Sequence, residues 1–321
     1  MDSITQAALG AAVAQAGWGR TLGRNAMLWG LLWGTFPDLD ILTFPWLDDS
    51  ERLGWHRGLS HSLLMMLVLS PVLAEIMHRL YREKCPRAGS TWTVFWILFT
   101  HVLIDCFTVY GTQIFEPFSN ERVGFNNLFI IDPLFTLPLL GGLAGAWYGK
   151  DEHIRRKANF WGLVFASLYV GWSFFAKDVA NRHFRSEMVQ RGITVDRLMT
   201  HPAPFNTIQW RLLAEDEKGY WIAYHSLLRR SQPVTFRYVA REEERLDNMK
   251  QHQAVRRLIW FSQGYFNVRE VDEVLIFSDL RFGEYEDPSG HVMGRFKWQV
   301  VRVDKTEETH DGTRIIKLPH R

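Results

Sequence analysis

Residues 158–176 form a run, ANFWGLVFASLYVGWSFFA, that contains no charged residue. A helix needs about 20 mainly apolar residues to cross the hydrocarbon core of a bilayer, and this run is close to that length. A buried helix of a soluble α-helical domain is the alternative, but the many aromatic residues of the run favour contact with lipid. The run therefore predicts a membrane-spanning helix.

Five earlier segments have a similar character, although polar side chains interrupt most of them. They are 4–19, 25–44, 59–78, 91–110 and 129–149. The first is short and rich in Ala and Gly, so it is either a short span or a helix packed inside a bundle. We expect a mainly α fold for residues 1–178, in which about five to six short helices form a polytopic membrane bundle.

The second half of the chain is more polar and has a different pattern. Segments rich in aromatic and β-branched residues predict strands at 205–215, 220–228, 234–240, 273–279 and 295–303. Residues 241–264 predict an amphipathic helix. We therefore expect a small soluble α+β domain at 179–321, and we find no GxSxG, Walker or dinucleotide-binding motif in it.

Composition excludes some classes of protein. The formal net charge is +2, so the chain carries no strong attraction for nucleic acid. The two cysteines, Cys85 and Cys106, form neither a disulfide framework nor a CxxC metal motif. The first residues, which include Asp2 and lack a basic cluster, do not match a cleavable signal peptide.

Basic residues between the segments predict an orientation. Basic loops occur at 19–24, 78–87 and 150–157, after the first, third and fifth segments. If the segments alternate in direction, these loops share one side, and the positive-inside rule makes that side cytoplasmic. The domain at 179–321 then lies on the outer side. Basic residues at 177–185 oppose this orientation, although long domains cross membranes largely regardless of charge.

With this topology, most polar side chains of the apolar half gather at the outer ends of the segments. They are Asp2, Asp38, Asp40, His56, His61, His101, Asp105 and Asp132. Charged side chains at membrane depth are costly and usually functional. We therefore expect a polar site at the outer level of the membrane.

The spacing of these residues favours a metal site. His101 and Asp105 are four residues apart, so a helix places both on one face, where they could bind one ion or face a partner. His56 and His61, in the stretch HRGLSH, would diverge on a straight helix, so we expect a turn at Gly58 between them. Mixed imidazole and carboxylate ligands suit zinc, manganese or iron.

Three nearby residues extend this chemistry. Asp38 and Asp40 follow Pro37, which breaks a helix, and are candidates for further ligands or for a general base. The guanidinium of Arg57 could hold an anionic oxygen, because its fork matches phosphate or carboxylate. A divalent ion in such a site could generate hydroxide from bound water near neutral pH.

Each feature also has a structural alternative. An isolated HxxxD pair on a helix is usually an ordinary polar pair, and the stretch PDLD could be only a helix-ending turn. Asp132, which precedes Pro133, could cap a helix. Asp2 could be a solvated terminus. The joint placement of all these residues at one level favours a site over the separate explanations.

Five stretches of the first half resemble one known family. They are MDSITQAALGAAV, GTFPDLDIL, WHRGLSHSLL, THVLIDCFTVYGTQIFEPFS and FNNLFIIDPLFTLPLL. The pattern resembles the YdjM-like family of membrane-bound proteins, described as LexA-binding inner-membrane proteins and as metal-dependent hydrolases. The resemblance covers about residues 1–178. The downstream stretch HPAPFNTIQWRLLAEDEKGYW is similar to the tail of a longer subgroup.

This resemblance implies a multi-pass protein of the bacterial inner membrane that uses a divalent metal ion. On our topology the C-terminal domain would be periplasmic, and a LexA contact would need a cytoplasmic surface. By position, the implied site comprises Asp2, Asp38, Asp40, His56, His61, His101, Asp105 and Asp132. Many members carry a Thr-His pair near the start, where this chain has Thr5 and Gln6.

Three functions follow as hypotheses. The first is a membrane-bound metal-dependent hydrolase acting on an amphiphilic substrate, such as a lipid phosphate or another lipid ester. In it the first metal ligands are His56, His61, His101 and Asp105, with Asp2 and Asp132 added by the resemblance. The alternatives are a proton-coupled transporter, since intramembrane Asp and His also form proton relays, and a non-catalytic scaffold whose outer domain binds a partner. Membrane lipids are the expected partners, and nucleic acid is not.

Overall fold

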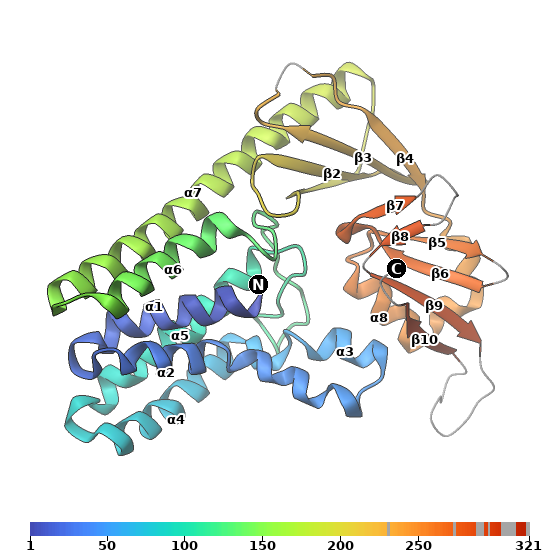
Figure 1. Cartoon of the computed structure of the whole chain (residues 1–321). Coiled ribbons are helices and arrows are strands. Elements are labelled where there is room, and N and C mark those ends of the chain that lie inside the picture. Colours follow the sequence, from blue (N-terminus) through green and yellow to red (C-terminus); the bar gives the residue numbers. More distant parts are fainter. Residues whose placement is uncertain (230–231, 272–273, 287–291, 295, 303–312, 319–321) are drawn as a thin grey trace.

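The computed structural model describes residues 1–229, 232–271, 274–286, 292–294, 296–302 and 313–318. Helices dominate the chain up to residue 190, and strands dominate after it (Figure 1). A mostly helical N-terminal region followed by a C-terminal β-sheet domain confirms the coarse fold prediction.

Each of the six apolar segments contains a helix. The helices of this region are α1 (Ser3–Leu22), α2 (Asn25–Gly34), α3 (Asp49–Trp55), α4 (Leu63–Tyr81), α5 (Arg87–Cys106), α6 (Pro133–Tyr148) and α7 (Glu152–Gln190). Three short 3-10 helices join them, namely η1 (Pro37–Trp46), η2 (Leu59–His61) and η3 (Arg82–Lys84). The segment at 25–44 departs from a single helix, because Pro37 has no backbone N–H to continue α2 and starts η1 instead.

Two helices among the described residues are long and apolar enough to cross a membrane, at Leu63–Lys84 and Glu152–Gln190. A polytopic bundle of five to six spans is therefore not confirmed. The ten residues of α2 extend only about 15 Å, half the thickness of a bilayer core. The prediction counted apolar residues without knowing that Pro37 divides this segment.

Glycines allow the closest helix contact of the bundle, between α1 and α2. A Cβ atom on Gly30 would lie 2.3 Å from the carbonyl oxygen of Gly10 and 2.4 Å from the Cβ of Ala14. A Cβ on Gly34 would lie 2.8 Å from the Cα of Gly10. Small residues let helix backbones approach this closely, which increases the van der Waals contact between the two helices.

The described residues of the C-terminal domain form two four-stranded antiparallel sheets and one two-stranded sheet. The first sheet has the order β1 (Arg197–Pro202), β2 (Gln209–Glu215), β3 (Gly219–Ser226), β4 (Phe236–Ala240). The second has the order β10 (Thr313–Lys317), β9 (Lys297–Arg302), β6 (Val274–Asp279), β5 (Phe266–Val271), and β7 (Glu284–Glu286) pairs with β8 (Val292–Gly294). The predicted strands coincide with β2, β3, β4, β6 and β9, while residues 273, 295 and 303 lie outside the described part.

The helix expected at 241–264 is shorter than predicted. A 3-10 helix, η4 (Glu243–Gln251), precedes α8 (Gln253–Phe261), and the chain kinks at Asp247 with a φ of 41°. The apolar residues of α8 join a core with Leu53 of α3, so the C-terminal domain packs against the helical region.

The long helix α7 connects the two regions. Its second half packs on the first sheet, where Ala180 and Phe184 share a buried cluster with Trp210 and Leu212 (Figure 1). The expected domain boundary at residue 178 lies inside this helix.

The α1–α2 contact gives a stability prediction. Replacing Gly30→Ala should lower the free energy of unfolding by about 1–3 kcal/mol, because the added methyl group overlaps the backbone of α1. The matched control is Gly171→Ala on α7, where nothing lies within 4 Å of the new Cβ. Thermal unfolding in detergent measures both variants. Equal melting temperatures would show that the close approach does not limit stability.

Candidate metal centre

The stretch HRGLSH forms a turn between its two histidines. His56 ends α3, Arg57 has a left-handed φ of 59°, and His61 ends η2. Gly58 is required here by space, since a Cβ would lie 2.8 Å from both the carbonyl oxygen of Gly54 and a carboxylate oxygen of Glu116. The ring centroids of His56 and His61 are 5.9 Å apart, so the turn keeps the two imidazoles close, as the sequence predicted.

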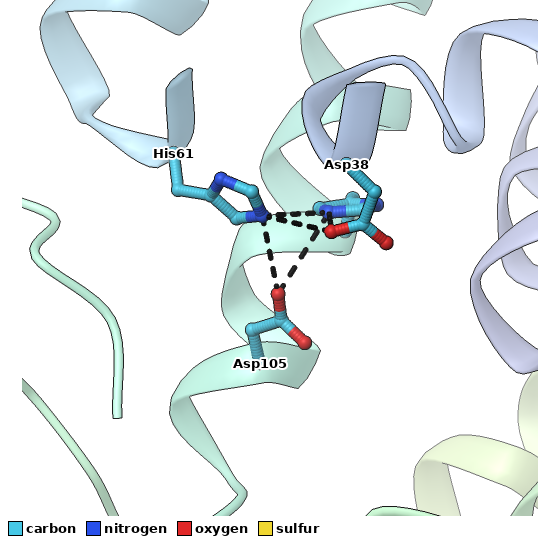
Figure 2. A group of neighbouring side chains, drawn as sticks. Asp38, His61 and Asp105 are labelled. Atoms are coloured by element: carbon cyan, nitrogen blue, oxygen red, sulfur yellow. Dashed lines mark hydrogen bonds and ion pairs between the residues drawn. The ribbon is translucent and has the colours of Figure 1, made fainter. Parts of the chain in front are cut away.

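Four side chains from three elements converge beside this turn. They are Asp38 from η1, His61 from η2, and His101 and Asp105 from α5, and one ligand atom of each lies within 4.8 Å of the others. Figure 2 shows Asp38, His61 and Asp105 pointing toward one another. His101 and Asp105 share a helix face, as their spacing of four predicts. Their Nε2 and Oδ2 atoms are 3.7 Å apart.

The tautomers of the two histidines follow from their outer hydrogen bonds. His101 Nδ1 lies 2.6 Å from the carbonyl oxygen of Gly34, which only accepts, so Nδ1 carries the proton. The Ser60 hydroxyl donates to Asp40 Oδ2 at 2.8 Å and is left to accept the Nδ1–H of His61, also at 2.8 Å. Both Nε2 atoms therefore present lone pairs, and they face each other at 3.2 Å.

Asp105 divides its two oxygens between different tasks. Oδ1 accepts hydrogen bonds from the Gln6 amide at 2.8 Å and the Met1 amino group, and it pairs with Arg57 Nη2 at 3.0 Å. Oδ2 is buried and has no hydrogen-bond donor among the described residues. It lies 3.4 Å from His61 Nε2 and 3.7 Å from His101 Nε2. Burying a hydrogen-bond acceptor without a donor costs free energy. A cation beside Oδ2 would offset this cost.

The group fits a divalent metal ion. Nitrogen and oxygen ligands about 2.0–2.2 Å from a zinc ion at the tetrahedral angle lie about 3.3–3.6 Å apart. Five of the six separations lie between 3.2 Å, between the two imidazoles, and 3.7 Å, from His101 to Asp38 and to Asp105, and all six are within 4.8 Å. The histidine Nδ1 contacts with a carbonyl and a hydroxyl are those that usually orient metal-binding imidazoles. The Asp38 side chain, 18% exposed, is the accessible edge of the group.

Asp40 and His56 form a separate pair at the edge of this centre. His56 Nδ1 donates to Asp40 Oδ1 at 2.9 Å, and Asp40 Oδ2 accepts from the Ser60 hydroxyl. Burial lowers the pKa of His56, which favours its neutral form. The structure does not bring His56 into the four-residue group, so its role as a metal ligand stays a prediction.

Arg57 faces the protein interior. Its Nη2 pairs with Asp105, and its Nη1 donates to the Thr108 hydroxyl at 3.0 Å. The side chain is 3% exposed and stacks on the ring of Tyr110. The geometry therefore makes Arg57 the partner of Asp105. The contact with an anionic head group that the sequence predicted would need the terminal nitrogens of Arg57. Nη1 and Nη2 already bind Thr108 and Asp105.

Asp2 and Asp132 lie outside the four-residue group. The Asp2 side chain caps α1 by accepting from the backbone N–H of Thr5 at 3.0 Å. Asp132 caps α6 through Leu134 and accepts a hydrogen bond from Tyr169 at 3.0 Å. The capping alternative therefore describes the observed contacts of both residues, and their roles as ligands stay predictions.

Sequence reasoning did not assign two residues of the centre. Gln6 donates to Asp105 from α1, and its Oε1 is buried with no donor among the described residues. Ser60 joins His61 to Asp40. Ser60 stands inside HRGLSH, but a serine has no spacing signal of its own. Gln6 was visible only as a departure from the Thr-His pair of similar proteins.

A ring of arginines and aromatic side chains joins the centre to the C-terminal domain. Tyr110 lies between the guanidinium groups of Arg57 and Arg122, at 4.8 Å and 4.7 Å from the ring centroid. Arg122 also stacks on Phe261 of α8. Burial lowers the pKa of Arg122 to about 10.

Comparison with known proteins identifies the family of the helical region. The family model described as YdjM inner membrane protein matches residues 1–180, more than half of the chain and all four residues of the centre. The chain belongs to the YdjM inner membrane protein family. The resemblance drawn from the sequence is thus confirmed at the level of the family, and with it placement in an inner membrane.

A curated relative is similar over a shorter region. The uncharacterized protein YfhP of Bacillus subtilis (strain 168) is 28% identical over 134 residues, which cover 42% of this chain and 38% of the relative. This chain thus spans well under half of that relative's length. No solved structure matches.

Proposed function

We propose that this protein is a membrane-embedded metal-dependent hydrolase that acts on an amphiphilic substrate such as a lipid phosphate. One observation carries the proposal: four acceptor atoms, from Asp38, His61, His101 and Asp105, converge in a mostly buried place. Membership of an inner-membrane family supports a substrate that is reached from the bilayer.

The four converging side chains would hold the ion, which would be zinc, manganese or iron given their mixed nitrogen and oxygen atoms. When bound, a divalent ion supplies a Lewis acid that polarises a phosphoryl or carbonyl oxygen and makes a water molecule more acidic. Arg57 and Gln6 would orient Asp105 through their contacts with Oδ1. Gly34 and Ser60 would fix the two imidazoles by accepting hydrogen bonds from their Nδ1–H groups.

The His56–Asp40 pair would take a proton from the water molecule and deliver one to the leaving oxygen. Asp40 fixes the His56 ring by accepting from Nδ1, which leaves the Nε2 lone pair available, and no described residue hydrogen-bonds that atom. A neutral imidazole held by a carboxylate is a suitable general base for a water molecule and a suitable acid for a leaving oxygen. In this proposal His56 acts beside the ion, in place of the ligand role first expected of it.

The first test is metal content. Elemental analysis of the detergent-purified protein should find a stoichiometric divalent ion that is lost in His61→Ala and in Asp105→Ala, because each removes a converging atom. His153→Ala, at an exposed position in the first turn of α7, is the matched histidine control and should keep the ion. A folded wild type that binds no ion, even after one is added back, would overturn the proposal and favour the transporter and scaffold hypotheses.

The second test separates proton transfer from metal binding. The change His56→Gln should leave the metal content intact while lowering phosphate release from dioleoyl phosphatidic acid by about 10²–10⁴-fold, the usual contribution of a general base. Phosphate release and metal content are measured on the same preparation. Loss of the ion in this variant would instead place His56 among the ligands.

We also propose that the protein crosses the membrane more than twice, with the C-terminal domain on the periplasmic side. The basic α1–α2, α4–α5 and α6–α7 turns lie at the end of the helical region far from the sheets (Figure 1). Large apolar side chains are exposed on α5 and α6 as well as on the two candidate spans. They include Trp92, Trp96, Leu137 and Leu140.

The orientation has a direct test. A phosphatase reporter fused after residue 321 should be active, because it is exported with the domain, and a fluorescent reporter that matures only in the cytoplasm should be dark. The same two reporters fused after residue 84, in the α4–α5 turn, serve as the control and should give the opposite result. A cytoplasmic signal at residue 321 would reverse the topology.

A further inference from the structure

A cavity of about 990 Å³ lies between the helical region and α8 of the C-terminal domain. Residues from α3, η2 and α4 form one side, and residues from α8 form the other. The two sides differ in chemistry.

One part of the wall from the helical region is apolar and continues onto a candidate membrane span. Met65 and Leu69 line the cavity from α4, four residues apart and therefore on one face of that helix. Leu59 of η2 adds to this apolar part. Leu67 and Val68 of α4 are exposed beside this face. These side chains give a hydrocarbon chain an apolar surface that leads from α4 into the cavity.

The wall from α8 is cationic. Gln253, Arg256, Arg257 and Trp260 line the cavity and recur at the spacing of one helix face. The opposite face of α8 is apolar and lies in the core with Leu53, so the helix cannot rotate to withdraw its arginines. Arg257 is tethered by the Ser50 hydroxyl at 3.0 Å and by Glu51 at 3.8 Å. The Arg256 side chain is exposed and has no acidic partner among the described residues.

Two acidic residues of the cavity already have partners. Asp40 accepts from His56 and Ser60, and Glu51 faces Arg257. Glu116 also lines the cavity, from the side of the helical region. On α8, Arg256 has no acidic partner among the described residues, so its guanidinium is available to pair with an anion.

The cavity adjoins the metal centre through Asp40 and Ser60, which line it, whereas the four converging residues do not. The Ser60 hydroxyl accepts a hydrogen bond from the Nδ1–H of His61. One hydrogen bond therefore separates the cavity wall from an imidazole of the centre.

We propose that this cavity binds an amphiphilic phosphate, with its hydrocarbon chain along Leu59, Met65 and Leu69 and its phosphate at Arg256 and Arg257. This assignment rests on the proposed function, whose substrate class it specifies. It also gives the C-terminal domain a role, since the residues that recognise the anion come from α8. The phosphate contact first assigned to Arg57 belongs here to the arginines of α8.

The test is a set of titrations of the full chain in detergent, with EDTA present so that no divalent ion takes part. The ligands are dihexanoyl phosphatidic acid, dihexanoylglycerol and inorganic phosphate. The wild type should bind the lipid phosphate more tightly than either of the other two, because only that ligand contacts both walls. Equal affinity for the glycerolipid would overturn anion selection, and equal affinity for free phosphate would overturn the role of the apolar wall.

Two variants locate the binding site. Arg256→Gln should weaken binding of the lipid phosphate about tenfold or more, the usual effect of losing a charge-assisted hydrogen bond. Arg185→Gln, an exposed arginine on α7, is the matched control and should bind as the wild type does. Leu69→Trp should also weaken the lipid phosphate, because it fills the apolar wall. Equal losses in Arg256→Gln and Arg185→Gln would show general electrostatics and overturn the assignment.

These titrations fail independently of the hydrolase proposal. Selective binding in EDTA by a protein that contains no metal and releases no phosphate would keep the cavity assignment and reject the hydrolase. A metal-loaded protein that shows no selectivity among the three ligands would do the reverse.

Discussion

The convergence of two imidazole lone pairs and two carboxylates is the interaction on which the arrangement of the helical region depends. Four acceptors without a proton among them repel one another, and burial strengthens that repulsion because water no longer screens it. Several neighbouring groups reduce the cost. Arg57, Gln6 and the Met1 amino group share Oδ1 of Asp105, while Gly34 and Ser60 hold the outer nitrogens of the imidazoles. A divalent cation at the centre would remove the remaining repulsion.

Several local features of the backbone follow from this requirement. Gly34 ends α2 and presents its carbonyl oxygen to His101, and Pro37 then starts a 3-10 helix that carries Asp38 to the centre. The left-handed residue Arg57 and the confined Gly58 reverse the chain before His61. Residues in such unusual conformations cost free energy and persist where the surrounding contacts fix them. Here the surrounding contacts are those of the centre itself.

The C-terminal domain packs directly against the helical region that carries the centre. Its α8 packs on α3, which His56 follows directly, and the guanidinium of Arg122 contacts the rings of both Phe261 of α8 and Tyr110. The cavity uses both regions, with an apolar wall from a membrane helix and a cationic wall from α8. A cavity with one apolar and one cationic wall suits an amphiphile, because its hydrocarbon chain and its charged head group need different surroundings.

The sequence by itself determined the family, the helical segments, five of the ten described strands and the pair on α5. A four-residue spacing fixes the shared face of His101 and Asp105 whatever surrounds the helix. It did not determine which of eight acidic and imidazole side chains would meet. Asp2 and Asp132 belong to the same level of the predicted topology as Asp38, yet both cap helices. The tertiary structure decided which of these side chains converge. It also brought Gln6 and Ser60 to the centre and the α8 arginines to the cavity beside it. The reason is that a spacing pattern reports neighbours within one element, whereas this centre and its cavity join elements far apart in the chain.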